Sequence, residues 1–199
     1  LFSEWADVGR DEGMQQGHAA SVDVMLKQLL RGRQQPFTAI DIGCGNGWVV
    51  RKLNNEPLCK HACGVDGASS MIAKAKAIDP DGNYIEATLP EWRPAEPVDL
   101  VHSMECLYYL QDPIEFLHRL HNDWVAPGGR VVIGVDHYEE NPSSHGWGPS
   151  LNVHMALLPI KRWKEGLAAA GFVDVEATQV GAKEQWSGTL VLTANRRAD

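Results

Sequence analysis

Two kinds of apolar pattern alternate along the chain. Short runs of apolar, β-branched residues predict strands covered on both faces, and residues 37–42 and 98–103 are typical examples. The predicted strands are residues 37–42, 60–66, 83–86, 98–103, 131–135, 173–180 and 189–195. Between them, apolar residues recur at helical spacing. Strands that alternate with helices favour an α/β fold with a mostly parallel sheet.

The helical stripes are clearest in three segments. Residues 19–30 carry Val22, Met25, Leu26, Leu29 and Leu30 on one face, and residues 113–123 carry Ile114, Phe116, Leu117 and Leu120. Residues 159–170 form a third helix, ended by Gly171. A shorter helix is expected at residues 46–53. Residues 136–150 are interpreted as a polar loop, longer than a minimal connection.

Residues 1–18 do not fit either pattern. They are rich in glycine and polar groups yet contain Trp5, Met14 and His18, and we expect no independent element there. One interpretation is a lid that closes over a ligand. The other is an arm packed on the surface, anchored by Trp5.

Three glycines follow the first predicted strand at once. Gly43, Gly45 and Gly47 let the backbone turn sharply and approach a ligand, while the next helix points free N–H groups at it. The spacing is G-x-G-x-G, whereas the dinucleotide fingerprint is G-x-G-x-x-G. Asp41 also lies inside the strand, where a carboxylate repels a pyrophosphate and suits a cationic ligand. A nucleotide-like ligand with a positive charge is therefore expected.

Asp66 ends the second predicted strand, 19 residues after Gly47. This is close to the separation at which α/β nucleotide sites place an acidic residue on the ribose hydroxyls. Ser69 or Ser70 can cap the helix that follows, and Met71 is placed to pack against an adenine. A ribose-bearing ligand is the consequence.

In combination these motifs resemble class I S-adenosylmethionine-dependent methyltransferases of the small-molecule type. The resemblance is carried by residues 41–47, by Asp66, by the fourth strand with residues 104–113, and by the Pro127-Gly128-Gly129 turn before an apolar strand. It covers residues 37–195 and weakens in the arm and the loop after the fifth strand. It implies a Rossmann-like, doubly wound, seven-stranded, mostly parallel sheet whose last strand is antiparallel.

The same resemblance implies S-adenosyl-L-methionine as the cofactor. The residues expected to bind it are Trp5, Asp41, Gly43, Cys44, Gly45, Asp66, Gly67, Met71, Ala87, Thr88, Leu89, Ser103 and Met104. Members of the family often place an acidic residue after the third strand to receive the adenine amino group. Here Ala87 and Thr88 stand in that place, so backbone groups or the Thr88 hydroxyl would do that work.

A catalytic base is needed only if the methyl acceptor loses a proton. The candidates on the substrate side are Glu105, Tyr109, His137, His154 and His18, with Tyr138 and His145 as further possibilities. Each histidine also has a structural interpretation, and His102, His118 and His121 are expected to be structural or exposed. Trp5, His18, Glu105, Tyr109, His137, Tyr138, Trp147 and His154 are the residues available to line an acceptor pocket. This mixture of aromatic and titratable groups suits a small polar metabolite such as an amine, thiol or carboxylate.

Composition limits the classes of molecule that the protein is expected to bind. The 199 residues suit a single methyltransferase domain, with residues 1–18 as the lid arm. The formal charge of −8 and the lack of basic runs argue against nucleic acid. No membrane segment is evident, and the four cysteines are expected to be reduced thiols in a cytoplasmic protein, a monomer or homodimer. Cys59, His61 and Cys63 would share one face of a strand, but no second ligand pair accompanies them, so no metal is expected.

Two other functional classes remain open from the sequence. An NAD-dependent oxidoreductase would use the same acidic residue on its ribose, although Asp41 and the glycine spacing count against it. A protein that binds S-adenosylmethionine without catalysis and regulates a partner is the other alternative.

Overall fold

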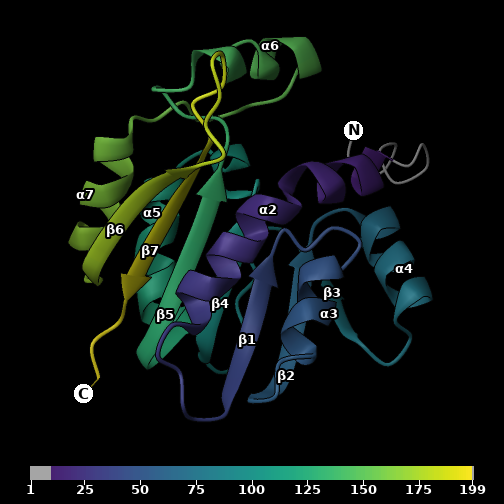
Figure 1. Ribbon diagram of the computed structural model, residues 1–199. Coiled ribbons are helices and arrows are strands. Elements are labelled where there is room, and N and C mark those ends of the chain that lie inside the picture. Colours follow the sequence, from purple (N-terminus) through teal and green to yellow (C-terminus); the bar gives the residue numbers. More distant parts are fainter. Residues whose placement is uncertain (1–9, 199) are drawn as a thin grey trace.

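The computed structural model describes residues 10–198, with the side chains from residue 12 onward. Seven strands form one sheet in the order β3-β2-β1-β4-β5-β7-β6 (Figure 1). The strands are β1 (Phe37–Ile42), β2 (Cys59–Asp66), β3 (Asn83–Glu86), β4 (Val98–Met104), β5 (Val125–Val135), β6 (Val173–Val180) and β7 (Thr189–Asn195). Four of these strands begin and end at the residues predicted from the sequence.

The sheet is parallel from β3 to β5, and β7 is antiparallel to both of its neighbours, β5 and β6. This confirms the predicted seven-stranded, Rossmann-like arrangement with an antiparallel last strand. The order of the strands reverses between β1 and β4, which are hydrogen-bonded neighbours. In sheets of this kind, ligands bind at the carboxyl ends of the strands beside such a reversal.

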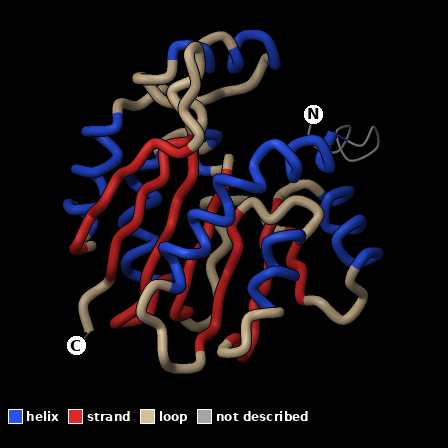
Figure 2. Tube along the Cα trace, viewed as in Figure 1, coloured by secondary structure: helices blue, strands red, loops and turns tan. Residues whose placement is uncertain are grey.

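Helices cover both faces of the sheet (Figure 2). On one face lie α2 (Arg10–Leu30), α3 (Trp48–Asn54) and α4 (Ser69–Ile78), and on the other lie α5 (Pro113–Arg119) and α7 (Ile160–Ala170). Strand β1 shows why its sequence is apolar without alternation. Ile40 and Ile42 pack on the α5/α7 side, while Phe37 and Ala39 pack on the α2/α3 side. No helix of the described chain is long and apolar enough to cross a lipid bilayer.

The first described helix differs from the prediction because it begins at Arg10 rather than near residue 19. Gly13 and Gly17 lie inside it, and a glycine costs a helix about 1 kcal/mol relative to alanine. Side-chain contacts offset this cost. Glu12 pairs with Lys74 of α4 at 3.2 Å, and His18 contacts Asp136 at 3.1 Å. Tertiary contacts therefore extend the helix beyond what the local pattern predicts.

The segment after β5 is also more ordered than a polar loop. It contains the 3₁₀ helix η3 (Pro142–Ser144) and the helix α6 (Trp147–Leu151). Tyr138 and Asn141 are fully buried within it. The Asn141 amide donates to the Asp136 carbonyl at 2.7 Å, and the Tyr138 hydroxyl donates to the Gly188 carbonyl at 3.0 Å. The hairpin loop before β7 thus supplies partners that the local sequence does not reveal.

Two smaller expectations are corrected. The helix predicted at residues 113–123 becomes a π-helix, η2 (Leu120–Trp124), after Arg119. At the start of α4 the N-cap residue is Ala68, whose methyl side chain cannot cap the helix, and the Asp66 carboxylate accepts the Ala68 N–H. The serines expected as caps lie inside the helix. A short 3₁₀ helix, η1 (Leu107–Tyr109), follows β4.

Candidate active site

A cleft of about 550 Å³ opens at the carboxyl ends of the central strands, at the reversal of strand order. Its floor is formed by the loops after β1, β2, β3 and β4. Its roof is the amino-terminal half of α2, which lies above the ends of β1 and β2 in Figure 1 and contributes Met14, Gln15 and His18. Residues 10–18 of the predicted arm are therefore helical and contribute to the cleft, while residues 1–9 lie outside the described part of the chain.

The glycines of the loop after β1 serve different purposes. A Cβ at Gly43 would lie 2.7 Å from the Cys106 Sγ, so this glycine lets the loop pack against the end of β4. At Gly45 a Cβ would meet nothing within 4 Å, and the residue has a left-handed backbone with φ +52°. At Gly45 a ligand in the cleft can therefore come close to the backbone without meeting a side chain.

Asp66 connects this loop to the end of β2. Its Oδ2 accepts the Gly45 N–H at 2.9 Å, and its Oδ1 accepts the Ala68 N–H at 2.8 Å. Burial raises the pKa of the Asp66 carboxyl, while these two N–H groups oppose the shift. A carboxylate has about four lone-pair sites, so two remain for a ligand's hydroxyl groups.

Asp41 is paired beneath the loop. Its Oδ1 lies 2.7 Å from the His102 Nδ1, and both residues are buried at facing positions of β1 and β4. Both also line the cleft. The His102 Nε2 has no hydrogen-bond partner within the described part of the chain. The sequence analysis expected a structural or exposed histidine here and did not anticipate this pair.

A second acidic group lies where β4 and β5 end. Glu105 Oε1 accepts the Asp136 backbone N–H at 2.5 Å, and its Oε2 accepts the Tyr108 hydroxyl at 2.7 Å. The Asp136 Oδ2 lies 3.1 Å from the His18 Nε2, while its Oδ1 is buried without a partner among the described residues. Carboxylates from two strands thus meet a histidine from α2 beside the cleft.

Burial and neighbouring charges shift the pKa values of the titratable side chains at this place. Burial and the nearby Asp136 carboxylate raise the pKa of Glu105 to about 8. Burial lowers the pKa of His18, but the hydrogen bond to Asp136 and the charge of Glu105 raise it more, so it ends above its ordinary value. Burial raises the pKa of Tyr109 to about 12, so its phenol keeps its proton at neutral pH. The pKa values of Glu105, His18 and Tyr109 therefore all lie above their ordinary values.

His18, Glu105 and Asp136 also bring one ligand atom each within 4.8 Å of one another, a spacing close enough for the three to contact one metal ion. Cys59, His61 and Cys63 do not converge in this way. The register shifts where β2 begins, so Cys59 packs on the α2/α3 side of the sheet and Cys63 on the other. Their expected common face is therefore lost to this irregularity, and His61 bonds to the Asn83 amide instead.

Most residues expected to bind the cofactor gather in the cleft. Those that line it are Asp41, Gly43, Cys44, Gly45, Asp66, Gly67, Met71, Ala87, Thr88, Leu89 and Met104. Ser103 does not line it, because its side chain is buried and donates to the Ile42 carbonyl at 3.1 Å. Trp5 lies outside the described residues.

The residues expected on the substrate side divide between two places. His18, Glu105 and Tyr109 line the cleft. His137 and His154 line a second, more open depression of about 500 Å³, together with His145. The two places share a wall. His137 contacts the Tyr108 ring at 5.6 Å between centroids, and the His154 Nε2 lies 3.1 Å from the Leu110 carbonyl.

The remaining acceptor candidates lie near that second depression or deeper. Trp147 stacks on His137 at 6.4 Å, and Tyr138 is buried against the loop before β7. The sequence analysis missed Gln15 and Asp136 as well as His102. Asp136 stands directly after the last residue of β5, and a carboxylate at a strand's carboxyl end was the signal that could have identified it.

Comparisons with known proteins agree on one family. A family model described as a methyltransferase domain matches residues 13–177. A trans-aconitate 2-methyltransferase of Azoarcus sp. (strain BH72) is 28% identical over 159 residues, covering 76% of the chain and 60% of that protein. The corresponding protein of Klebsiella pneumoniae (strain 342) is 31% identical over 101 residues, covering 51% and 40%. The chain thus spans about half the length of these curated relatives.

Solved structures share the fold. A chain from the complex of the Haloferax volcanii Trm112 methyltransferase activator with a methyltransferase superposes with a TM-score of 0.82 at 25% identity, covering 99% of this chain and 98% of that one. An S-adenosylmethionine-dependent methyltransferase from Mesorhizobium loti has a TM-score of 0.75 at 20% identity and covers 89% and 98%. The N-methyltransferase NodS from Bradyrhizobium japonicum WM9, in complex with S-adenosyl-L-homocysteine, has a TM-score of 0.67 at 22% identity and covers 87% and 84%.

Proposed function

The chain belongs to the class I S-adenosylmethionine-dependent methyltransferases, and from that premise we propose that it transfers the methyl group to a small polar metabolite by in-line displacement. S-adenosyl-L-methionine is the cofactor. When bound, it supplies a methyl group already activated by a sulfonium, so the protein's main task is alignment. Favourable alignment contributes roughly 7–11 kcal/mol to lowering a barrier.

The residues of the cleft fit this cofactor. We propose that Asp66 receives the two ribose hydroxyls on its unused lone pairs, and that the cofactor's methionine part lies over Gly45. Asp41 is paired with His102 beneath that loop and supplies negative potential for the cofactor's amino group. Met71, Ala87, Thr88 and Leu89 line the part of the cleft suited to the adenine.

The acceptor side is proposed to be the part of the cleft under α2. Glu105, Tyr109 and His18 line it, and of these Glu105 and His18 are the candidate bases. His137 and His154 are proposed to act indirectly, through Tyr108 and Leu110, by positioning the shared wall. A cavity of about 550 Å³ that also holds the cofactor leaves room only for a small acceptor. The curated relatives act on trans-aconitate, also a small molecule.

One observation carries this proposal. The open backbone at Gly45 and the partly buried carboxylate of Asp66 meet in a single hydrogen bond of 2.9 Å, at the reversal point of the sheet. That arrangement suits a ribose next to a cationic group, and it draws together two motifs 21 residues apart.

Calorimetric titration with S-adenosylmethionine and S-adenosylhomocysteine tests the cofactor site. Asp66→Ala removes a charged acceptor of two hydroxyl groups, which is worth about 1.5–3 kcal/mol, so we expect affinity to fall roughly tenfold to a hundredfold. The exposed Asp81 lies outside the cleft, and Asp81→Ala is the matched control. Unchanged binding by Asp66→Ala would refute this placement of the cofactor.

A further inference from the structure

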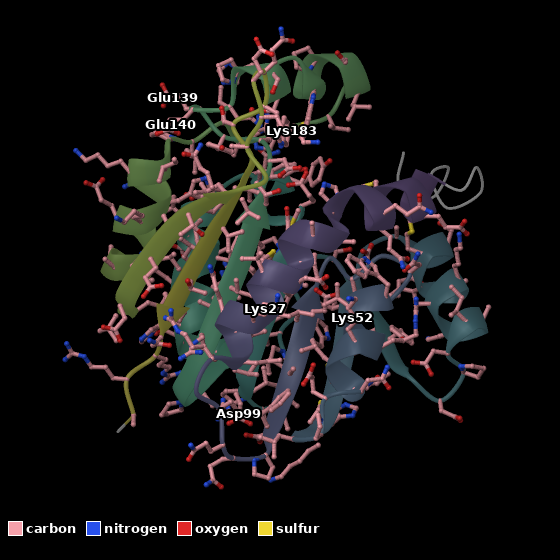
Figure 3. All side chains as sticks on the ribbon, in the orientation of Figure 1. Lys27, Lys52, Asp99, Glu139, Glu140 and Lys183 are labelled. Atoms are coloured by element: carbon pink, nitrogen blue, oxygen red, sulfur yellow. The ribbon has the colours of Figure 1, made fainter. Side chains whose placement is uncertain are left out.

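The cleft is acidic. Asp41, Asp66 and Glu105 line it, and Asp136 lies directly behind Glu105 and His18. No lysine or arginine is among the described residues that line it. The labelled lysines of Figure 3 lie elsewhere: Lys27 and Lys52 on the outer sides of α2 and α3, and Lys183 in the loop before β7.

The acidic groups fall into two sets with different neighbours. Asp41 and Asp66 are beside the glycine loop, where the first is paired with His102 and the second with two backbone N–H groups. Glu105 lies at the end of β4 with Asp136 beside it, and His18 is the one basic side chain the described residues bring to them. The acceptor side therefore holds two carboxylates and a single histidine.

This balance discriminates between acceptor charges. A carboxylate acceptor would lose its water beside Glu105, with Asp136 behind that residue and only His18 to compensate, and the cost rises with each added negative charge. A cationic acceptor is favoured by the same field, and its positive charge beside Glu105 lowers the pKa of that carboxyl and so favours the carboxylate form. The face of Tyr109, next to Glu105 in the cleft, adds a favourable surface for a cation.

Resting on the methyl transfer proposed above, we propose that the acceptor is a primary or secondary amine that binds as its ammonium ion, with Glu105 as its ion partner and proton acceptor. The acceptor of the curated relatives, a tricarboxylate, is then excluded by charge. Glu105 is thereby the residue that determines specificity.

The chemistry balances without another reactant. The ammonium N–H bond breaks, and its proton moves to the Glu105 carboxylate, leaving a neutral amine with a free electron pair. That pair forms the new N–C bond to the methyl carbon while the C–S bond breaks and its electrons remain on sulfur. The positive charge moves from sulfur to the methylated nitrogen, and the proton on Glu105 passes to solvent through the cleft.

Two readouts test the inference. First, the protein is given methyl-labelled cofactor with matched panels of primary and secondary amines and of mono-, di- and tricarboxylates including trans-aconitate. Mild alkali then separates the products, because methyl esters release label as methanol and N-methyl groups do not. Second, calorimetry measures binding of an accepted amine to the protein saturated with S-adenosylhomocysteine, which requires no turnover.

We expect alkali-stable label in at least one amine and none in the carboxylates. Glu105→Gln keeps the shape of the side chain, and we expect it to lower both amine binding and kcat/KM at least tenfold while S-adenosylhomocysteine affinity changes less than twofold. Glu115→Gln on the exposed side of α5 removes an equal charge outside the cleft and is expected to change neither.

The outcomes separate the two proposals. Methylation of a carboxylate, or of any acceptor class without an amine, overturns the amine inference and leaves methyl transfer standing. An amine that is accepted equally well by Glu105→Gln overturns the role of Glu105. Failure to bind either form of the cofactor overturns the proposed function itself.

Discussion

Glu105 is unfavourable to the folded state in two ways. Its backbone has φ 55°, a left-handed conformation that costs a residue with a Cβ about 1–2 kcal/mol. Its carboxyl is withdrawn from water beside a second carboxylate. Neighbours hold it there, since its N–H donates to the Gly134 carbonyl at 2.9 Å and its carboxylate accepts the Asp136 N–H. Strain kept in place by surrounding structure is typical of functional positions.

This predicts how stability depends on pH. The pKa of Glu105 rises from 4.5 to about 8 on folding, so between those values the folded protein holds a proton that the unfolded chain has released. Stability from this group is therefore present at low pH and falls as pH rises toward 8. Glu105→Gln has no carboxyl group to ionise, so this loss of stability does not occur in the variant. The difference in Tm between the variant and the parent should therefore increase from pH 5 to pH 8.5, by about 2–4 °C for each kcal/mol of folding free energy that the parent loses.

Differential scanning calorimetry at several pH values measures this trend, with Glu115→Gln as the control for removing one carboxylate. A Tm difference that stays constant from pH 5 to pH 8.5 would show that Glu105 is not held protonated by the fold.

The two glycines after β1 should separate stability from binding. Gly43→Ala places a methyl group 2.7 Å from the Cys106 Sγ, so we expect a loss of about 1–3 kcal/mol in the free energy of unfolding. Gly45→Ala meets no protein atom within 4 Å, so its stability cost is that of the left-handed backbone, yet the substitution adds a methyl group to a residue that lines the cleft. Urea unfolding and cofactor titration on both variants should therefore show Gly45→Ala with the larger loss of affinity and the smaller loss of stability.

At the scale of elements, α2 combines two roles along its length. Its carboxyl-terminal half is part of the core through Val22, Met25 and Leu29, all at most 1% exposed. Among the described side chains of its amino-terminal half, His18 lies against Asp136 after β5 and Glu12 pairs with Lys74 of α4. The latter pair is exposed and such pairs contribute about 0–1 kcal/mol. The half of α2 that forms the roof of the cleft is thus less strongly packed than its buried carboxyl-terminal half.

Removing the roof should accordingly affect turnover more than folding. A chain that begins at Ala19 keeps the buried stripe and loses Met14, Gln15 and His18 from the cleft. We expect its denaturation midpoint in urea to stay near that of the full chain while methyl transfer falls at least tenfold, since water then reaches the reacting groups. Met25→Ala is the opposite control, expected to cost about 2–5 kcal/mol in stability. Equal turnover with and without residues 1–18 would contradict the lid.

At the scale of the whole molecule, the histidines expected on the substrate side lie on either side of one wall. His18 lines the cleft, whereas His154 lines the second depression and bonds to the Leu110 carbonyl of the shared wall. We expect His18→Ala to lower the rate of methyl transfer roughly tenfold to a hundredfold, because it takes from the Asp136 carboxylate its side-chain partner beside the cleft, at a cost of about 1–3 kcal/mol. His154→Ala should act only by loosening the wall, with an effect of about 1 kcal/mol or less, less than tenfold in rate. Single-turnover rates with saturating cofactor compare the two variants. An equal loss of rate in both would indicate that the acceptor binds toward the second depression.

Local signals in the sequence are enough to predict the sheet and to place Asp41, Gly45 and Asp66 at one edge of it. Both depend on local signals: apolar runs that mark buried strands, glycines that follow a strand at once, and Asp66 at the end of the next. Because parallel strands bring their carboxyl ends to one edge, motifs far apart in the chain fall together without further information. This is why Asp41, Gly45 and Asp66 all line one cleft.

Only the tertiary structure decided the acceptor side. The helix over residues 10–18 is stabilised by contacts with residues more than 60 positions away. The side chain of Asp136 contacts His18 of α2, and its backbone N–H donates to Glu105 at the end of β4. The local pattern at residues 136–150 is typical of a loop, and it does not indicate that His137 and His154 lie on the far side of the wall that Tyr108 and Leu110 form. Long-range burial and charge, which no short window of sequence contains, separate the histidine beside the cleft from the histidines behind it.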